Sequence, residues 1–196
     1  MIGIGVSFFT FSCTNLDEEL FDQVTADNFF QTEQELIAGL GAAYSSFGGL
    51  GNHSNLWSTN ELVSDELIIT TKGGDWFDGG VLQQLHLHTY TPDNGFFNNT
   101  WGMLYGGVNT ANRLIFQFEQ LKAQGNTSAD AFIAELRGVR ALWYYWIMDG
   151  FGRGPLATDF TDTEAKAAST RQELYNFIES ELNAIIPVLP TAKAAS

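Results

Sequence analysis

The chain has 196 residues, 44% of them hydrophobic and 14% aromatic, which is enough for one sizeable hydrophobic core. Nine basic residues against 23 acidic ones give a net charge of −14, which disfavours nucleic acid and direct adsorption to anionic lipid as partners. One cysteine leaves no internal disulfide, so packing must stabilise the fold.

The first twelve residues, MIGIGVSFFTFS, carry no charge and directly precede Cys13. Such a run is shorter than the about 20 residues that span a bilayer, but it matches the apolar region of a secretory signal. Ser12 before a lone cysteine is the pattern of a bacterial lipoprotein signal, although no Lys or Arg precedes Ile2. We expect residues 1–12 to be a signal peptide and Cys13 to carry the lipid that anchors the protein to a membrane.

A first helix is predicted after Thr32, because Thr32 and Glu35 have the spacing of a capping box. Apolar residues then follow in steps of 4, 3 and 4, at Leu36, Leu40, Ala43 and Phe47, up to the glycines at 48, 49 and 51. Residues 50–94 break this pattern, and we expect them to form a long irregular connection. Long loops of this kind are disproportionately functional.

Two long helices follow and are predicted to form an antiparallel hairpin joined by about six residues near Gly125. Asp93 and Thr127 are the expected N-caps. The apolar positions step by 4 and 3, and they are Phe97, Trp101, Leu104, Val108, Ala111, Ile115 and Phe118, then Phe132, Leu136, Val139, Trp143 and Trp146. The segment ALWYYWIM is so apolar that further helices must cover the second helix on more than one side.

One covering helix is predicted to begin at Thr170, where TRQE is a second capping box, and to end at Pro187. Its expected apolar face consists of Leu174, Ile178, Leu182 and Ile185. The two expected caps of the hairpin are 34 residues apart, which is the tetratricopeptide period. The predicted fold class is therefore all-α, with tetratricopeptide-like helical hairpins and a long irregular loop insertion.

Several blocks occur in an order that makes the chain resemble the N-terminal part of the SusD/RagB family of nutrient-binding outer-membrane lipoproteins. After Cys13 and NLDEEL come TADNFFQTEQELIAGLGAAYSSF, SDEL at 64–67, DWFDGG at 75–80, WGMLYGGVNTANRLI at 101–115 and AELRGVRALWYYWIMDGFGRGPL at 134–156. Arg153 and Gly154 depart from the family pattern. Family members are much longer, so residues 13–196 are expected to be the N-terminal part of an incomplete SusD-like domain.

The resemblance implies a lipid-anchored protein on the outer surface of a Gram-negative outer membrane. Such proteins sit on a SusC-like TonB-dependent transporter and hand it oligosaccharides. The resemblance therefore implies no enzymatic activity and no cofactor, and neither a facing pair of catalytic carboxylates nor a nucleophile motif is identifiable. Two alternatives remain open: a helical-repeat adaptor whose ligand is another protein, and capture of peptides instead of glycans.

The stretch TTKGGDWFDGG, residues 70–80, is the predicted ligand site. Sugar binding needs flat aromatic rings for stacking and a few polar groups for the hydroxyls, and Lys72, Asp75, Trp76 and Asp78 supply both within one loop. The alternative is that Trp76 and Phe77 fold back over the hydrophobic hairpin while the acids are merely solvated.

Other polar residues are predicted to have structural roles. His86 and His88 would share one face of an extended segment, but no third ligand for a metal is identifiable, and no metal site is predicted. Asn109 and Asn112 are expected to fix helix packing. Arg140 is expected to pair with a carboxylate such as Glu135 or Asp149.

Overall fold

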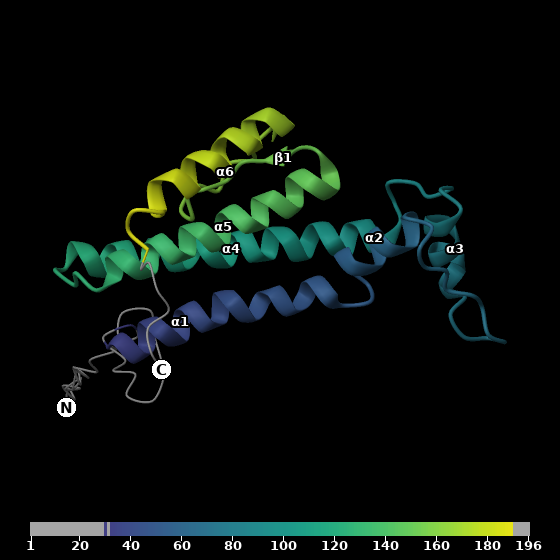
Figure 1. Cartoon of the computed structure of the whole chain (residues 1–196), viewed down its shortest axis with the longest axis horizontal. Helices are drawn as coiled ribbons and strands as arrows, with labels where there is room; N and C mark the ends of the chain where they lie inside the picture. The colour runs from purple at the N-terminus through teal and green to yellow at the C-terminus, as the bar shows by residue number, and fades with distance from the viewer. Residues whose placement is uncertain (1–29, 31, 190–196) are drawn as a thin grey trace, which may run out of the picture.

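The computed structural model describes residue 30 and residues 32–189, and this part of the chain is almost entirely helical (Figure 1). The helices are α1 (Glu33–Ser45), α2 (Leu56–Val63), α3 (Val81–His86), α4 (Gly95–Ala123), α5 (Ala129–Phe151) and α6 (Arg171–Ile185), with 3₁₀ helices at Ser46–Gly51 and Asp78–Gly80. The two-residue strands β1 (Gly154–Pro155) and β2 (Ala168–Ser169) pair antiparallel. The predicted all-α fold class is confirmed. None of the helices in the described part combines the length and apolarity that crossing a membrane requires.

The α4–α5 hairpin is present as predicted, but the N-cap of each helix lies one residue later than expected. The N-cap of α4 is Asn94, one residue after Asp93, and its Oδ1 accepts a hydrogen bond from Phe96 N at 3.0 Å. Helix α5 begins after Ser128 instead of Thr127. Here the Asn126 side chain accepts the Ser128 N–H at 3.1 Å, so a local turn replaces a side-chain cap.

The core lies where α4 and α5 pack against each other. Trp143 of α5 is fully buried and lies against Gly107 of α4, where a Cβ atom would come within 2.2 Å of the indole ring. The absence of a side chain at Gly107 therefore allows this close approach. Phe47 stacks on the indole ring of Trp143, with ring centroids 4.6 Å apart.

Helices α1 and α6 lie on opposite sides of the hairpin, so α5 is covered on more than one side as predicted (Figure 1). Both predicted capping boxes are formed, by Thr32 with Glu35 at the start of α1 and by Thr170 with Glu173 at the start of α6. Each box satisfies two N–H groups that a helix start otherwise leaves free. The helices that cover the hairpin thus begin where the sequence predicts.

The prediction of one irregular connection over residues 50–94 is wrong, because α2 and α3 form within it. These short helices bury Leu62, Leu82 and Leu85 in a small cluster of their own, against which Phe96 and Phe97 of α4 pack. Helices this short are unstable alone, so tertiary packing stabilises them. The cluster holds the segment that contains residues 70–80 against the N-terminal end of α4 (Figure 1).

Candidate functional site

The loop at residues 70–80 starts with a tight backbone turn. Lys72 N donates to Asp75 O, and Asp75 N donates to Lys72 O, both at 3.0 Å, so Gly73 and Gly74 form a two-residue reversal. Gly73 has φ of 64°, a conformation that glycine adopts without steric cost. The turn places the backbones of two predicted site residues, Lys72 and Asp75, directly opposite each other.

The aromatic part of the loop is exposed. The side chain of Trp76 is 44% exposed and that of Phe77 is 56% exposed, so neither folds back into the core. Trp76 and Asp78 have φ of 62° and 43°, in the left-handed region that costs a residue with a Cβ roughly 1–2 kcal/mol. The alternative in which these aromatics close over the hairpin is therefore not observed.

Contacts with neighbouring segments hold Trp76 in place. The imidazole of His53 meets its indole nearly edge-on, with ring centroids 6.3 Å apart and an interplanar angle of 80°. Gln83 of α3 donates through Nε2 to Trp76 O at 3.5 Å and to Thr71 Oγ1 at 3.1 Å. Lys72, Asp75 and Asp78 are also exposed. Their contact with a ligand stays a prediction.

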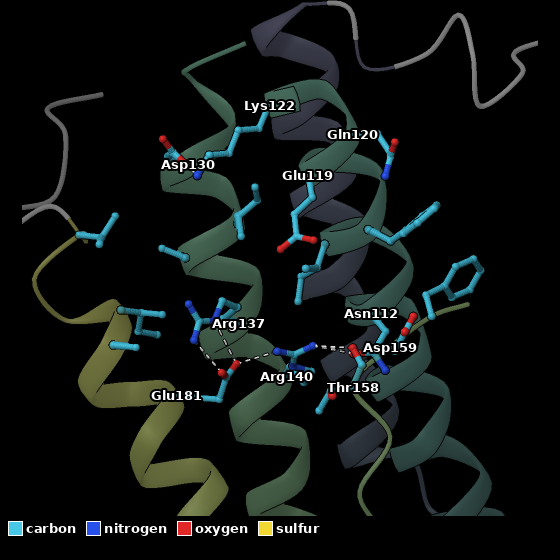
Figure 2. A pocket seen from close by; sticks show the side chains of 18 of the residues that line it. Asn112, Glu119, Gln120, Lys122, Asp130, Arg137, Arg140, Thr158, Asp159 and Glu181 are labelled. Atoms are coloured by element: carbon cyan, nitrogen blue, oxygen red, sulfur yellow. Dashed lines mark hydrogen bonds and ion pairs between the residues drawn. The ribbon is translucent and has the colours of Figure 1, made fainter. Parts of the chain in front are cut away.

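A second feature is a groove of about 920 Å³ between α4, α5 and α6 (Figure 2). Arg140 of α5 lies at its base with only 8% of the side chain exposed, and its Nη2 donates to Glu181 Oε2 of α6 at 2.7 Å. Arg137 donates to both oxygens of the same carboxylate, at 2.7 Å and 3.2 Å. Arg140 Nη1 also donates to Asn112 Oδ1 at 2.9 Å and to Thr158 O at 3.1 Å.

The electrostatics of this network follow from burial and pairing. Burial alone would raise the pKa of Glu181, but hydrogen bonds from Arg137 and Arg140 outweigh it and hold the pKa below its ordinary value. The hydrogen bond to Glu181 raises the pKa of Arg137 in turn. Both carboxylate oxygens of Glu181 already accept hydrogen bonds, so Glu181 needs no ligand to satisfy it, whereas the buried Nε of Arg140 has no hydrogen-bond partner in the part of the chain that the structure describes.

The network fixes the segment that follows β1. Asn112 Nδ2 donates to Ala157 O at 2.9 Å, and the Tyr144 hydroxyl bonds both the carbonyl and the N–H of Ala157. The prediction that Asn112 is part of the scaffold is therefore confirmed, while Asn109 is exposed. We interpret the groove network as a clamp that joins three helices and the segment after β1.

Two details near the groove differ from the sequence predictions. Arg140 pairs with a carboxylate as predicted, but this is Glu181 and neither of the suggested partners, Glu135 or Asp149. The carboxylate of Glu135 accepts a hydrogen bond from the Tyr44 hydroxyl at 2.7 Å instead. The buried face of α6 includes Glu181 at 8% exposure, whereas Leu182, predicted to be buried, is 40% exposed. The apolar spacing along α6 did not predict that Glu181 is buried, because its carboxylate is paired with arginines about 40 residues away in the sequence.

The histidines do not lie on an extended segment. His86 is the last residue of α3, and His88 follows the helix with φ of 54° while its Nε2 lies 2.9 Å from Val63 O. Within residue 30 and residues 32–189, no three side chains of the metal-ligating types converge. Cys13 and the predicted signal at 1–12 lie outside the described residues.

Comparison with known proteins confirms the resemblance drawn from the sequence. The profile of a SusD-like family, described as "Starch-binding associating with outer membrane", matches residues 16–195. SusD-like protein P2 of Formosa agariphila is 24% identical over 174 residues, which cover 87% of this chain and 34% of that protein. Starch-binding protein SusD of Bacteroides thetaiotaomicron is 26% identical over 140 residues, which cover 70% of this chain and 23% of that protein.

Solved structures show the same fold. A laminarin-binding SusD-like protein matches with a TM-score of 0.67 and 26% identity, over 82% of this chain and 35% of that one. A SusD superfamily protein from Bacteroides vulgatus matches with a TM-score of 0.68 and 16% identity, over 85% of this chain and 36% of that one. The chain thus spans 34% and 23% of the curated relatives that it matches.

Proposed function

The chain belongs to the SusD-like family of starch-binding proteins associated with the outer membrane, and on that premise we propose that it captures oligosaccharides at the cell surface. It delivers them to a SusC-like TonB-dependent transporter and catalyses no reaction on them. Acylated Cys13 anchors it to the outer membrane after removal of residues 1–12. The chain spans about a third or less of the length of these relatives, so the ligand and the transporter partner of a whole protein of this family are part of the proposal.

The observation that carries this proposal is the exposed indole of Trp76. A Trp in the left-handed region is unfavourable by roughly 1–2 kcal/mol relative to an ordinary conformation, and an indole that is 44% exposed recovers little of this cost by burial. Strain of this kind is concentrated at ligand sites, where the surrounding structure holds a side chain ready for a partner. The Lys72–Asp75 turn and the Gln83 hydrogen bonds supply that support.

The chemistry of the loop suits a saccharide. A pyranose presents a face of C–H groups that stacks on an indole ring, and its hydroxyls both donate and accept hydrogen bonds. Asp75 and Asp78 offer carboxylate acceptors, and Lys72 offers an ammonium donor, all exposed beside Trp76. The relatives named for binding starch and laminarin support soluble glucans as the first ligands to test.

The test is a calorimetric titration of the purified protein with soluble oligosaccharides from starch and laminarin. We expect Trp76→Ala to weaken binding at least about tenfold, which corresponds to the loss of about 1.4 kcal/mol. Tyr175→Ala is the control, because this tyrosine of α6 is 48% exposed, similar to Trp76, and α6 packs on α5 instead of on the loop. Full affinity in Trp76→Ala would refute the loop as the site.

The same titration separates the two alternatives. Binding of unrelated peptides, with no heat from any oligosaccharide, would assign the protein to peptide capture. If neither oligosaccharides nor peptides bind, but the Trp76→Ala variant still binds a protein partner, the chain is an adaptor. Aromatic residues are enriched at protein interfaces as well as at sugar sites, so the identity of the ligand decides the question.

A further inference from the structure

A hollow lined mainly by aromatic side chains is formed where α4 begins and α5 ends. This end of the hairpin lies opposite the α4–α5 connection (Figure 1). It has a volume of about 590 Å³, within the range typical of small-molecule sites. Its walls come from the segment before α4, the first turns of α4 and the last turn of α5. The residues used below are Tyr90, Thr91, Phe97, Asn98, Trp101 and Phe151. No residue of the loop at 70–80 lines it.

The aromatic walls of the hollow brace one another in two pairs. Trp101 and Phe151 meet edge to face with ring centroids 5.0 Å apart, and Tyr90 and Phe97 do so at 4.9 Å. Trp101 also packs against Tyr105 at 4.6 Å, and the Tyr105 hydroxyl donates to Pro155 O at 3.0 Å. Since aromatic pairs in this geometry are favourable, the rings are held before any ligand arrives.

The polar side chains of the hollow are uncharged and are free to hydrogen-bond a ligand. None of its lining residues carries a carboxylate, an ammonium or a guanidinium group, although the whole chain has a net charge of −14. The amide of Asn98 and the hydroxyls of Thr91 and Tyr90 make no side-chain hydrogen bond to any residue that the structure describes. An amide both donates and accepts, as a sugar hydroxyl does.

We propose that this hollow is a second saccharide site, separate from the loop at 70–80, that takes a neutral pyranose unit. The ring stacks on the aromatic walls formed by Trp101 and Tyr90, and Asn98 bonds its hydroxyls. An ionised ligand finds no counter-charge there. The inference rests on the proposed function, since both sites would contact glycan. The hollow would contact the glycan at a place that Trp76 does not reach.

The test reads binding at the hollow separately from binding at the loop. The indole N–H signals in a ¹H–¹⁵N NMR spectrum report each tryptophan, and Trp101→Phe assigns the signal of Trp101. We titrate maltose and laminaribiose into wild type and into Trp76→Ala. Both are expected to shift the Trp101 signal in a saturable way, and the apparent Kd at this signal should change less than about twofold in Trp76→Ala.

Two variants perturb the hollow without touching its buried wall. Tyr90 is 42% exposed and Asn98 is exposed, so Tyr90→Ala and Asn98→Leu should remain folded. Each is expected to raise the Kd at the Trp101 signal at least about fivefold. Tyr175→Ala, a tyrosine of 48% exposure on α6, should leave that Kd unchanged. The dispersion of the same spectra verifies the fold of each variant.

The outcomes separate this inference from the proposed function. If the disaccharides shift the Trp76 signal but not that of Trp101, the hollow is not a sugar site and the loop proposal stands. If they shift Trp101 alone, the hollow is a site and the loop proposal fails. A Trp101 shift that survives both Tyr90→Ala and Asn98→Leu, or that only a proline-rich peptide produces, overturns the inference.

Discussion

Removal of the Glu181 carboxylate tests the interpretation that the groove between α4, α5 and α6 is a structural clamp. Glu181→Ala leaves the guanidinium of Arg140 without its charged partner in a site where the Arg140 side chain is 8% exposed. A buried charge that loses its partner pays its desolvation penalty without compensation. We therefore expect a large loss of stability, not a local change at the surface.

The structure sets the size of this loss. Breaking a buried pair costs about 3–5 kcal/mol, and the Arg140–Glu181 pair, with side chains 8% and 10% exposed, is of this kind. Arg137 is 32% exposed, so its share is screened by water, and Arg137→Ala should cost only about 1 kcal/mol. For a chain of this length, the Glu181→Ala change lowers the melting temperature by roughly 6–20 °C.

The assay is urea unfolding followed by circular dichroism at the helix band, with Glu179→Ala as the control. Glu179 lies on the same helix but is exposed, so its removal should cost less than about 0.5 kcal/mol. An unfolding free energy for Glu181→Ala within about 1 kcal/mol of that of Glu179→Ala would refute the clamp. The groove would then have to be reconsidered as a site where Arg140 is held for a ligand.

The same carboxylate makes stability depend on pH. Pairing with the two arginines holds the pKa of folded Glu181 below the unfolded value of about 4.3. Its contribution is therefore complete above the unfolded pKa and is lost as the pH falls through the folded pKa. Unfolding free energies measured between neutral and acid pH should fall more steeply below about pH 4.5 in wild type than in Glu181→Gln.

Two further predictions concern the helices. Gly107→Ala places a methyl group within 2.2 Å of the Trp143 ring and should destabilise the fold by about 3 kcal/mol or more, whereas Gly106→Ala, with open space beside it, should be neutral or stabilising by up to about 1 kcal/mol. Equal urea midpoints for the two variants would contradict this packing. Thr170→Ala removes a capping box and should cost about 1 kcal/mol, while Ser128→Ala, which removes no capping bond, should cost a few tenths at most, as measured by thermal unfolding.

The sequence predicts those parts of the fold that depend on local order. The apolar stepping predicts α4 and α5, and the capping boxes place the starts of α1 and α6 correctly, because these signals act within one or two helical turns. The exposure of Trp76 is predicted on the same basis, since Trp76 and Phe77 are flanked on both sides by glycines and acids. Local chemistry is sufficient for these features.

The parts that the sequence does not predict depend on partners far along the chain. Helices α2 and α3 exist because Leu62, Leu82 and Leu85 meet one another and the phenylalanines of α4. Glu181 takes a buried position that an apolar pattern assigns to Leu182, because two arginines of α5 satisfy it. Neither arrangement has a signature within one helix. The aromatic hollow is of the same kind, since its walls come from segments about 50 residues apart.

The division of the core explains how this protein can hold a strained loop. The leucines that support residues 70–80 form a cluster separate from the main core around Trp143. Strain at Trp76 is opposed by local contacts with His53 and Gln83, which lie outside the main core. The hairpin is in turn held by the Glu181 network at a distant groove. Ligand affinity and global stability can thus change independently: a substitution at Trp76 should alter the first, and one at Glu181 the second.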